Sequence, residues 1–119
     1  MTCAEGTALP LDHTLVERLD GDDAIVDGVP MDYFAVQAPS PGIMTVEMAS
    51  ARLDPFLVFW TDDTRAPAAQ AFDIDGTGLV LRAHLEVPVY AGCHLVGATA
   101  WRAGEEGEYT LRAELHPGP

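Results

Sequence analysis

Apolar and polar residues alternate one by one along several short segments of the chain. Between positions 32 and 38 the apolar residues on one side are Phe34, Val36 and Ala38. Between positions 42 and 48 the same spacing selects Met44, Val46 and Met48. Successive side chains of a strand point to opposite faces, so this period predicts two strands, each with one buried face. The Pro39-Ser40-Pro41-Gly42 turn between them predicts that they form a hairpin.

Further segments show the same strand signals. Residues 54–60 form a dense apolar run, which predicts a central strand covered on both sides. Alternation also marks an early segment around 14–19, a segment from 79 to 86 and a segment from 93 to 101. We expect Val87-Pro88-Val89 to end the second of these. In a last segment, Tyr109, Leu111, Ala113 and Leu115 share a side. We therefore expect seven or eight strands.

Helical spacing is hard to find, because 11 glycines and 9 prolines interrupt the chain at close intervals. Short strands without helices between them predict an all-β fold, an antiparallel β-sandwich. We expect one sandwich domain over residues 13–116, preceded by a flexible segment over 1–12 and followed by a loose end. The predicted inward residues are Phe34, Val36, Met44, Val46, Leu57, Phe59, Leu79, Leu81, Val96, Tyr109 and Leu111.

Charge narrows the classes of partner. The 119 residues contain 6 basic and 19 acidic side chains, a formal charge of -13. Such a surface repels phosphate backbones, so nucleic-acid binding is not expected, whereas calcium or a basic partner suits it. No run approaches the roughly 18 to 20 apolar residues that cross a bilayer, so we expect no membrane insertion. The first residues lack a secretory signal pattern, which predicts a cytoplasmic protein, or a secreted one if the chain is an excised module.

The two cysteines, Cys3 and Cys93, are too few for a disulfide framework. Either they form one bridge or both are reduced, and the sequence favours reduced thiols. Cys93 stands beside His94, but adjacent residues of a strand face opposite sides, so the two cannot form a nucleophile–base pair.

The order of these motifs resembles the bacterial pre-peptidase C-terminal domain. The likeness runs over about residues 20 to 115 and includes the alternating segment that starts at Asp32, the Gly-led segments 42–48 and 92–98, the run Asp54-Pro55-Phe56-Leu57, and the ending Gly107-Glu108-Tyr109-Thr110-Leu111. The resemblance implies a jelly-roll-like β-sandwich that is usually appended to secreted proteases. It also implies a domain that is not itself a catalyst, and some relatives bind calcium or collagen.

Acidic residues are dense before the first long strand. Calcium takes six to eight oxygen ligands, which carboxylates and carbonyls on a loop can supply. Because relatives use the N-terminal approach to the sandwich, the resemblance implies a calcium site at Asp22, Asp23, Asp27 and Asp32. The alternative is that these residues cap turns and keep the ends of the sheets soluble. We predict that the domain requires no cofactor. Calcium is the one ion that we consider as a ligand.

Other constellations of chemistry-bearing residues are weak. The four histidines show no zinc-binding spacing, although His84 and His94 stand on neighbouring predicted strands and are candidates to approach each other. Neither serine lies in a Gly-x-Ser-x-Gly motif. Trp60, Trp101 and Tyr90 are candidate binding residues if they face outward, and otherwise they pack inside. We predict no catalytic residue and no enzyme.

The sequence thus predicts a non-catalytic β-sandwich module that acts through protein–protein association, either with a protein partner or with its own copies, and that calcium stabilises. Two alternatives remain open. One is a small carbohydrate-binding protein, because tryptophans and tyrosines stand near acidic segments. The other is an acidic mimic of nucleic acid that inhibits a basic protein, because the charge is -13.

Overall fold

The computed structural model describes residues 6–19, 24–26, 29–52, 55–60, 69–72, 81–100 and 107–117. Within these ranges it contains ten strands, of which seven have six or more residues. They are β1 (Thr7–Ala8), β2 (Thr14–Leu19), β3 (Ala24–Val26), β4 (Val29–Ala38), β5 (Gly42–Ser50), β6 (Pro55–Trp60), β7 (Ala69–Phe72), β8 (Leu81–Val89), β9 (Gly92–Ala100) and β10 (Gly107–Pro117). The all-β prediction is confirmed.

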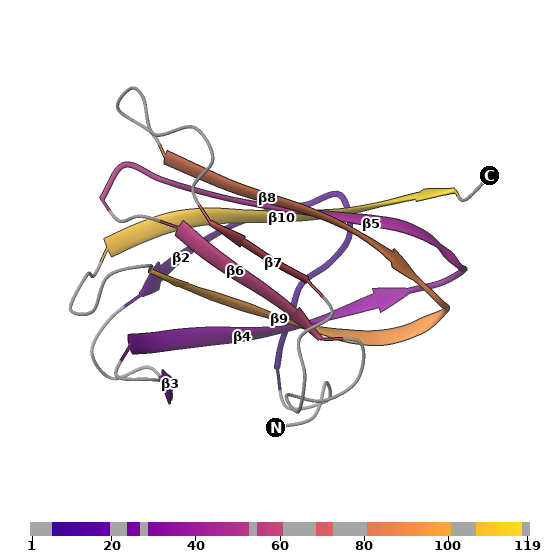
Figure 1. Cartoon of the computed structure of the whole chain (residues 1–119), viewed down its shortest axis with the longest axis horizontal. Coiled ribbons are helices and arrows are strands. Elements are labelled where there is room, and N and C mark those ends of the chain that lie inside the picture. The colour runs from indigo at the N-terminus through magenta and orange to yellow at the C-terminus, as the bar shows by residue number, and fades with distance from the viewer. Residues whose placement is uncertain are drawn as a thin grey trace.

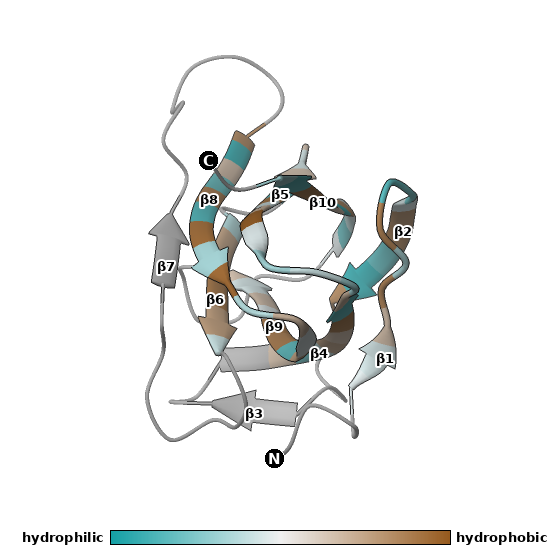
Figure 2. Cartoon of the chain, turned by 90° about the vertical axis from the view of Figure 1, so that its right-hand side faces the viewer, coloured by the Kyte–Doolittle hydropathy of each residue, from teal (hydrophilic) through white to brown (hydrophobic). Residues whose placement is uncertain are grey.

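The strands form two sheets that pack face to face (Figures 1 and 2). One sheet has the order β2-β10-β5-β8, and the other has the order β1-β4-β9-β6-β7 with β3 attached to β4. Neighbouring strands are antiparallel, apart from the short β1, which runs parallel to β4. The protein is therefore a β-sandwich, as the alternation of residues predicts.

The shared interior contains the alternating apolar residues of both sheets. Phe34, Val36, Met44 and Phe59 are among those that are almost completely buried there. A side chain of this size stabilises the fold by roughly 1.5 to 3 kcal/mol on full burial. The predicted inward residues are buried, apart from Leu81, which is partly exposed, and Leu79, which lies outside the described residues.

A second apolar cluster lies on the outer face of the larger sheet. Met31, Val58, Trp60 and Leu95 are buried there, and Tyr33 and Phe56 pack against them. Gly97 lies beneath this cluster, where a Cβ atom would come within 2.6 Å of the Met31 sulfur and 2.9 Å of the Trp60 ring. Strands β6 and β9 are thus covered on both sides. This arrangement confirms the prediction for residues 55–60.

The predicted hairpin between residues 32–38 and 42–48 is wrong. Strand β4 pairs with β9, whereas β5 pairs with β10 and β8, so the Pro39–Pro41 connection passes from one sheet to the other. A hairpin and such a crossing need the same alternation, because in both cases each strand buries one face. Periodicity alone cannot distinguish between them.

Two boundaries also differ from the prediction. Strand β8 continues through Pro88 to Val89 instead of ending at residue 86. Strand β8 lies at the edge of its sheet, where a missing backbone N–H is tolerated. Strand β1 also lies before the expected domain start at residue 13, and Leu9 after it is buried, with its N–H donating to the Ala35 carbonyl at 2.9 Å.

Candidate functional site: the outer face of the four-stranded sheet

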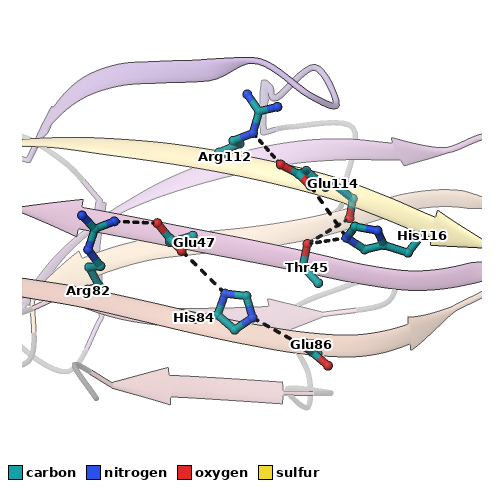
Figure 3. A network of polar contacts seen from close by, with 8 residues as sticks. All are labelled: Thr45, Glu47, Arg82, His84, Glu86, Arg112, Glu114 and His116. Carbon is teal, nitrogen blue, oxygen red and sulfur yellow. Dashed lines mark hydrogen bonds and ion pairs between the residues drawn. The ribbon is translucent and has the colours of Figure 1, made fainter. Parts of the chain in front are cut away.

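Polar side chains cover the outer face of the four-stranded sheet. The residues between the buried positions of β5, β8 and β10 point outward and form a continuous network (Figure 3). These residues, which we call the outer-face network, are Thr45, Glu47, Arg82, His84, Glu86, Arg112, Glu114 and His116.

The register of the strands brings these residues together. Glu47 on the central strand β5 lies opposite His84 on one side and opposite Arg112 on the other. One residue pair further along the sheet, Thr45 lies opposite Glu86 and Glu114. Directly opposed residues of an antiparallel pair have Cβ atoms about 4.5 to 5.5 Å apart, which lets charged side chains meet.

Two contacts of the outer-face network are ion pairs between an arginine and a glutamate, and others join histidines to glutamates or to Thr45. An Arg82 nitrogen lies 3.0 Å from a Glu47 oxygen, and Arg112 Nε donates to Glu114 at 2.7 Å. The His84 ring lies between Glu47 at 3.8 Å and Glu86 at 3.5 Å. The His116 Nε2 atom lies 3.2 Å from the Thr45 hydroxyl. The outer face of this sheet therefore carries both positively and negatively charged side chains.

The pKa of Glu114 shows the effect of this pairing. The hydrogen bond from Arg112 lowers the pKa of Glu114, and the charges of Arg112 and His116 lower it further, against a smaller opposing effect of burial. The carboxylate therefore stays ionised at a more acidic pH than an isolated glutamate. The residues around it line a shallow hollow of about 400 Å³ across the sheet.

The predicted calcium ligands are only partly described. Asp32 is half-buried on β4, and its carboxylate accepts a hydrogen bond from the hydroxyl of Tyr109 on β10. Asp22, Asp23 and Asp27 lie outside the described residues. Within the described ranges, three or more His, Cys, Asp or Glu side chains do not converge in a way that could hold a metal.

The predicted aromatic residues do not form one surface. Trp60 is only 6% exposed and packs in the second apolar cluster beside Tyr33, so it is not an outward binding residue. Tyr90 is 57% exposed. Trp101 lies outside the described residues.

The two histidines that were candidates to approach each other lie on different sheets. His84 belongs to the outer-face network on β8, whereas His94 on β9 is completely buried in the interior. The Nε2 atom of His94 lies 2.9 Å from the Tyr90 carbonyl, and its ring stacks on Phe59. The two do not approach each other, because β8 and β9 belong to different sheets, with His84 on the outer face and His94 in the interior.

The state of Cys93 also differs from expectation. Cys93 is disulfide-bonded, so the favoured reading of two reduced thiols is wrong. The chain has one other cysteine, Cys3, which lies outside the described residues.

The outer-face network itself was missed. Its members alternate with buried residues in the sequence, and that signal marks each of them as outward. The sequence does not show that β5 pairs with both β8 and β10, because these two strands are far from β5 along the chain.

Among the described residues, the structure contains no helix long and apolar enough to cross a membrane. No protein-family model and no curated protein sequence matches the chain.

Solved structures share its fold. The pre-peptidase C-terminal domain of a collagenase from Bacillus anthracis has 17% sequence identity and a TM-score of 0.64, over 92% of this chain and 95% of that domain. PliG from Aeromonas hydrophila, a periplasmic inhibitor of g-type lysozyme, has 13% identity and a TM-score of 0.56, over 92% of this chain and 96% of that one. CorA from Methylomicrobium album BG8, a surface-associated copper-binding protein, has 7% identity and a TM-score of 0.54, over 93% and 98% of the two chains. The chain therefore has the fold of the domain that its motifs resemble.

Proposed function

We propose that the chain is a non-catalytic β-sandwich module that binds another protein through the outer face of its four-stranded sheet. The observation that carries the proposal is the outer-face network: a rigid sheet presents both signs of charge in register, across a hollow of about 400 Å³. Complementary charges of this kind fix the orientation of a partner and reject others. The fold neighbours support the proposal, since one is an accessory domain and another is an inhibitor of an enzyme.

Site-directed cross-linking tests this proposal. A photoreactive phenylalanine analogue replaces Glu86, which is on the face and 65% exposed at its side chain. The matched control carries the analogue at Tyr90, which is exposed but outside the network. We expect defined adducts from position 86 and fewer from position 90. Equal or absent adducts, together with a monomer by light scattering, would contradict the proposal.

A lysozyme of g type is a defined first partner, because PliG inhibits one and shares the fold. The expected result is inhibition of the lysozyme by the chain, and reversal of the charges at Glu47 and Glu86 should weaken it. If lysozyme activity is unchanged, this partner is excluded and the cross-linked adducts identify another.

We also propose that the module works outside the cytoplasm. The disulfide at Cys93 supports this, because such bonds persist in oxidising compartments. Mass spectrometry after alkylation without reductant, on protein from the native cells, measures the modified fraction of Cys93. A thiol that is fully alkylated there would contradict the proposal.

Calcium stabilisation remains part of the proposal. Asp32 would supply one carboxylate, and the other proposed ligands are Asp22, Asp23 and Asp27. A ligand at a hundredfold excess over its Kd stabilises the native state by about 2.7 kcal/mol, so a thermal melt with calcium or chelator detects it. Magnesium serves as the control, and a melt that calcium does not shift, or that magnesium shifts equally, excludes a specific site.

A further inference from the structure

Of the four arginines that the structure describes, two differ from the other two in their partners. Arg82 and Arg112 pair with glutamates of the outer-face network. Arg18 on β2 and Arg52 just after β5 are both exposed, and neither forms an ion pair among the described residues. Among the described residues, these two arginines therefore differ from Arg82 and Arg112 in having no carboxylate partner.

The two arginines line the same hollow. It has a volume of about 580 Å³ and lies where β2 and β5 end and β10 begins. Ala49, Ala51 and Thr110 line it with small side chains. The volume of this hollow, which both arginines line, falls in the range of pockets for small ligands.

The backbone around Arg52 fixes its position. The Ser50 hydroxyl accepts a hydrogen bond from the Arg52 N–H at 3.0 Å and donates one to the Glu108 carbonyl at 2.8 Å. This ties the end of β5 to the start of β10. Gly107 has a φ of +153°, and a Cβ there would lie 2.6 Å from the Cβ of Arg52. A glycine at 107 therefore lets the stem of Arg52 lie against β10.

Among the described residues that line the hollow, Glu108 carries the one carboxylate. Glu108 is opposite Arg18 in the register of β2 and β10, yet the two do not form an ion pair. Among the described residues that line the hollow, two arginines therefore accompany one glutamate, whereas the whole chain carries -13.

We infer that this hollow, which we call the arginine pocket, binds a carboxylate between Arg18 and Arg52. Guanidinium groups bind carboxylates through paired N–H donors, and two of them can contact both oxygens. The inference does not rest on the proposed function, because the carboxylate can belong to an acidic peptide or to a small molecule.

An NMR titration tests the inference at constant ionic strength. The probes are acetate and an acetylated, amidated triglutamate peptide, with the triglutamine peptide as control. We expect saturable shifts confined to the Arg18 and Arg52 side chains and to the amides of residues 107–110. Tighter binding of the triglutamate peptide points to a polypeptide ligand, and equal binding of acetate per carboxylate points to a small molecule. Shifts that do not saturate, or that triglutamine reproduces, overturn the inference.

Variants sharpen the test. Arg18→Gln and Arg52→Gln should each weaken binding about fivefold, since an exposed ion pair contributes up to about 1 kcal/mol. Glu108→Gln should strengthen binding, because it removes the repelling carboxylate. His13→Gln, at an exposed position outside both the arginine pocket and the outer-face network, is the control and should bind as the unmodified protein does. Binding that Arg18→Gln and Arg52→Gln leave unchanged overturns the inference.

Discussion

The outer faces of the two sheets differ in kind. The four-stranded sheet exposes charged side chains in rows, whereas the outer face of the larger sheet carries a second apolar cluster of buried residues. One sheet thus has a single buried face and the other has two. The difference teaches that the central strands of the larger sheet pack on both faces, whereas the four-stranded sheet leaves a regular polar face to solvent.

Two valines test this contrast directly. Val58, on the outer face of the larger sheet, is 5% exposed. Val16, on the outer face of the four-stranded sheet, is 62% exposed. Val58→Ala should lower the free energy of unfolding by about 2 kcal/mol, because it removes buried methyl groups and leaves a cavity. Val16→Ala should change it by less than about 0.5 kcal/mol. Urea denaturation measures both, and equal effects would show that the second cluster is not a core.

A pair of tyrosines tests the link between the sheets. Tyr109→Phe removes the hydroxyl that donates to Asp32 across the sandwich, and should cost about 1 to 2 kcal/mol. Tyr90→Phe is the control, because Tyr90 is exposed and keeps its edge contact with the His94 ring as phenylalanine. Thermal melts compare the variants. If both are neutral, the Asp32 contact does not hold the sheets together.

The ion pairs of the exposed face should contribute little to stability. Arg82 and Glu47 are 51% and 44% exposed at their side chains. A double-mutant cycle with Arg82→Gln and Glu47→Gln should give a coupling of no more than about 0.5 kcal/mol. A much larger coupling would make this face a structural element instead of a surface for binding.

The smallest effect concerns the titration of Glu114. Because Arg112 lowers its pKa in the folded state, this contact stabilises the protein above the unfolded pKa of the carboxyl, and the stabilisation is lost as the pH falls through the folded value. Arg112→Gln should return the pKa toward its ordinary value, and His116→Gln should raise it less. Carboxyl chemical shifts in an NMR pH titration measure both, and an unchanged pKa in Arg112→Gln contradicts the assignment of the cause.

The sequence predicted the strands better than their pairing. Alternation identified the buried faces of residues 34–38, 44–48 and 109–113, because burial of one face is a local property of a strand. It could not show that β4 and β5 belong to different sheets, which depends on contacts with β9 and β10 far along the chain. Of the candidate binding residues, Trp60 packs in the second apolar cluster, and the sequence could not decide this because a surface aromatic and one in a second core have the same sequence pattern.

The central position of β10 has a consequence for how the molecule is assembled. Within the described part of the chain, β2 has no sheet partner other than β10, and β10 also separates β2 from β5. A nascent chain that has emerged only as far as residue 106 therefore holds β2 without a neighbour, and the polar face is not yet contiguous. Emergence of β10 is the step that joins the early and middle segments, so this sheet cannot form completely before residues 107–117 are available.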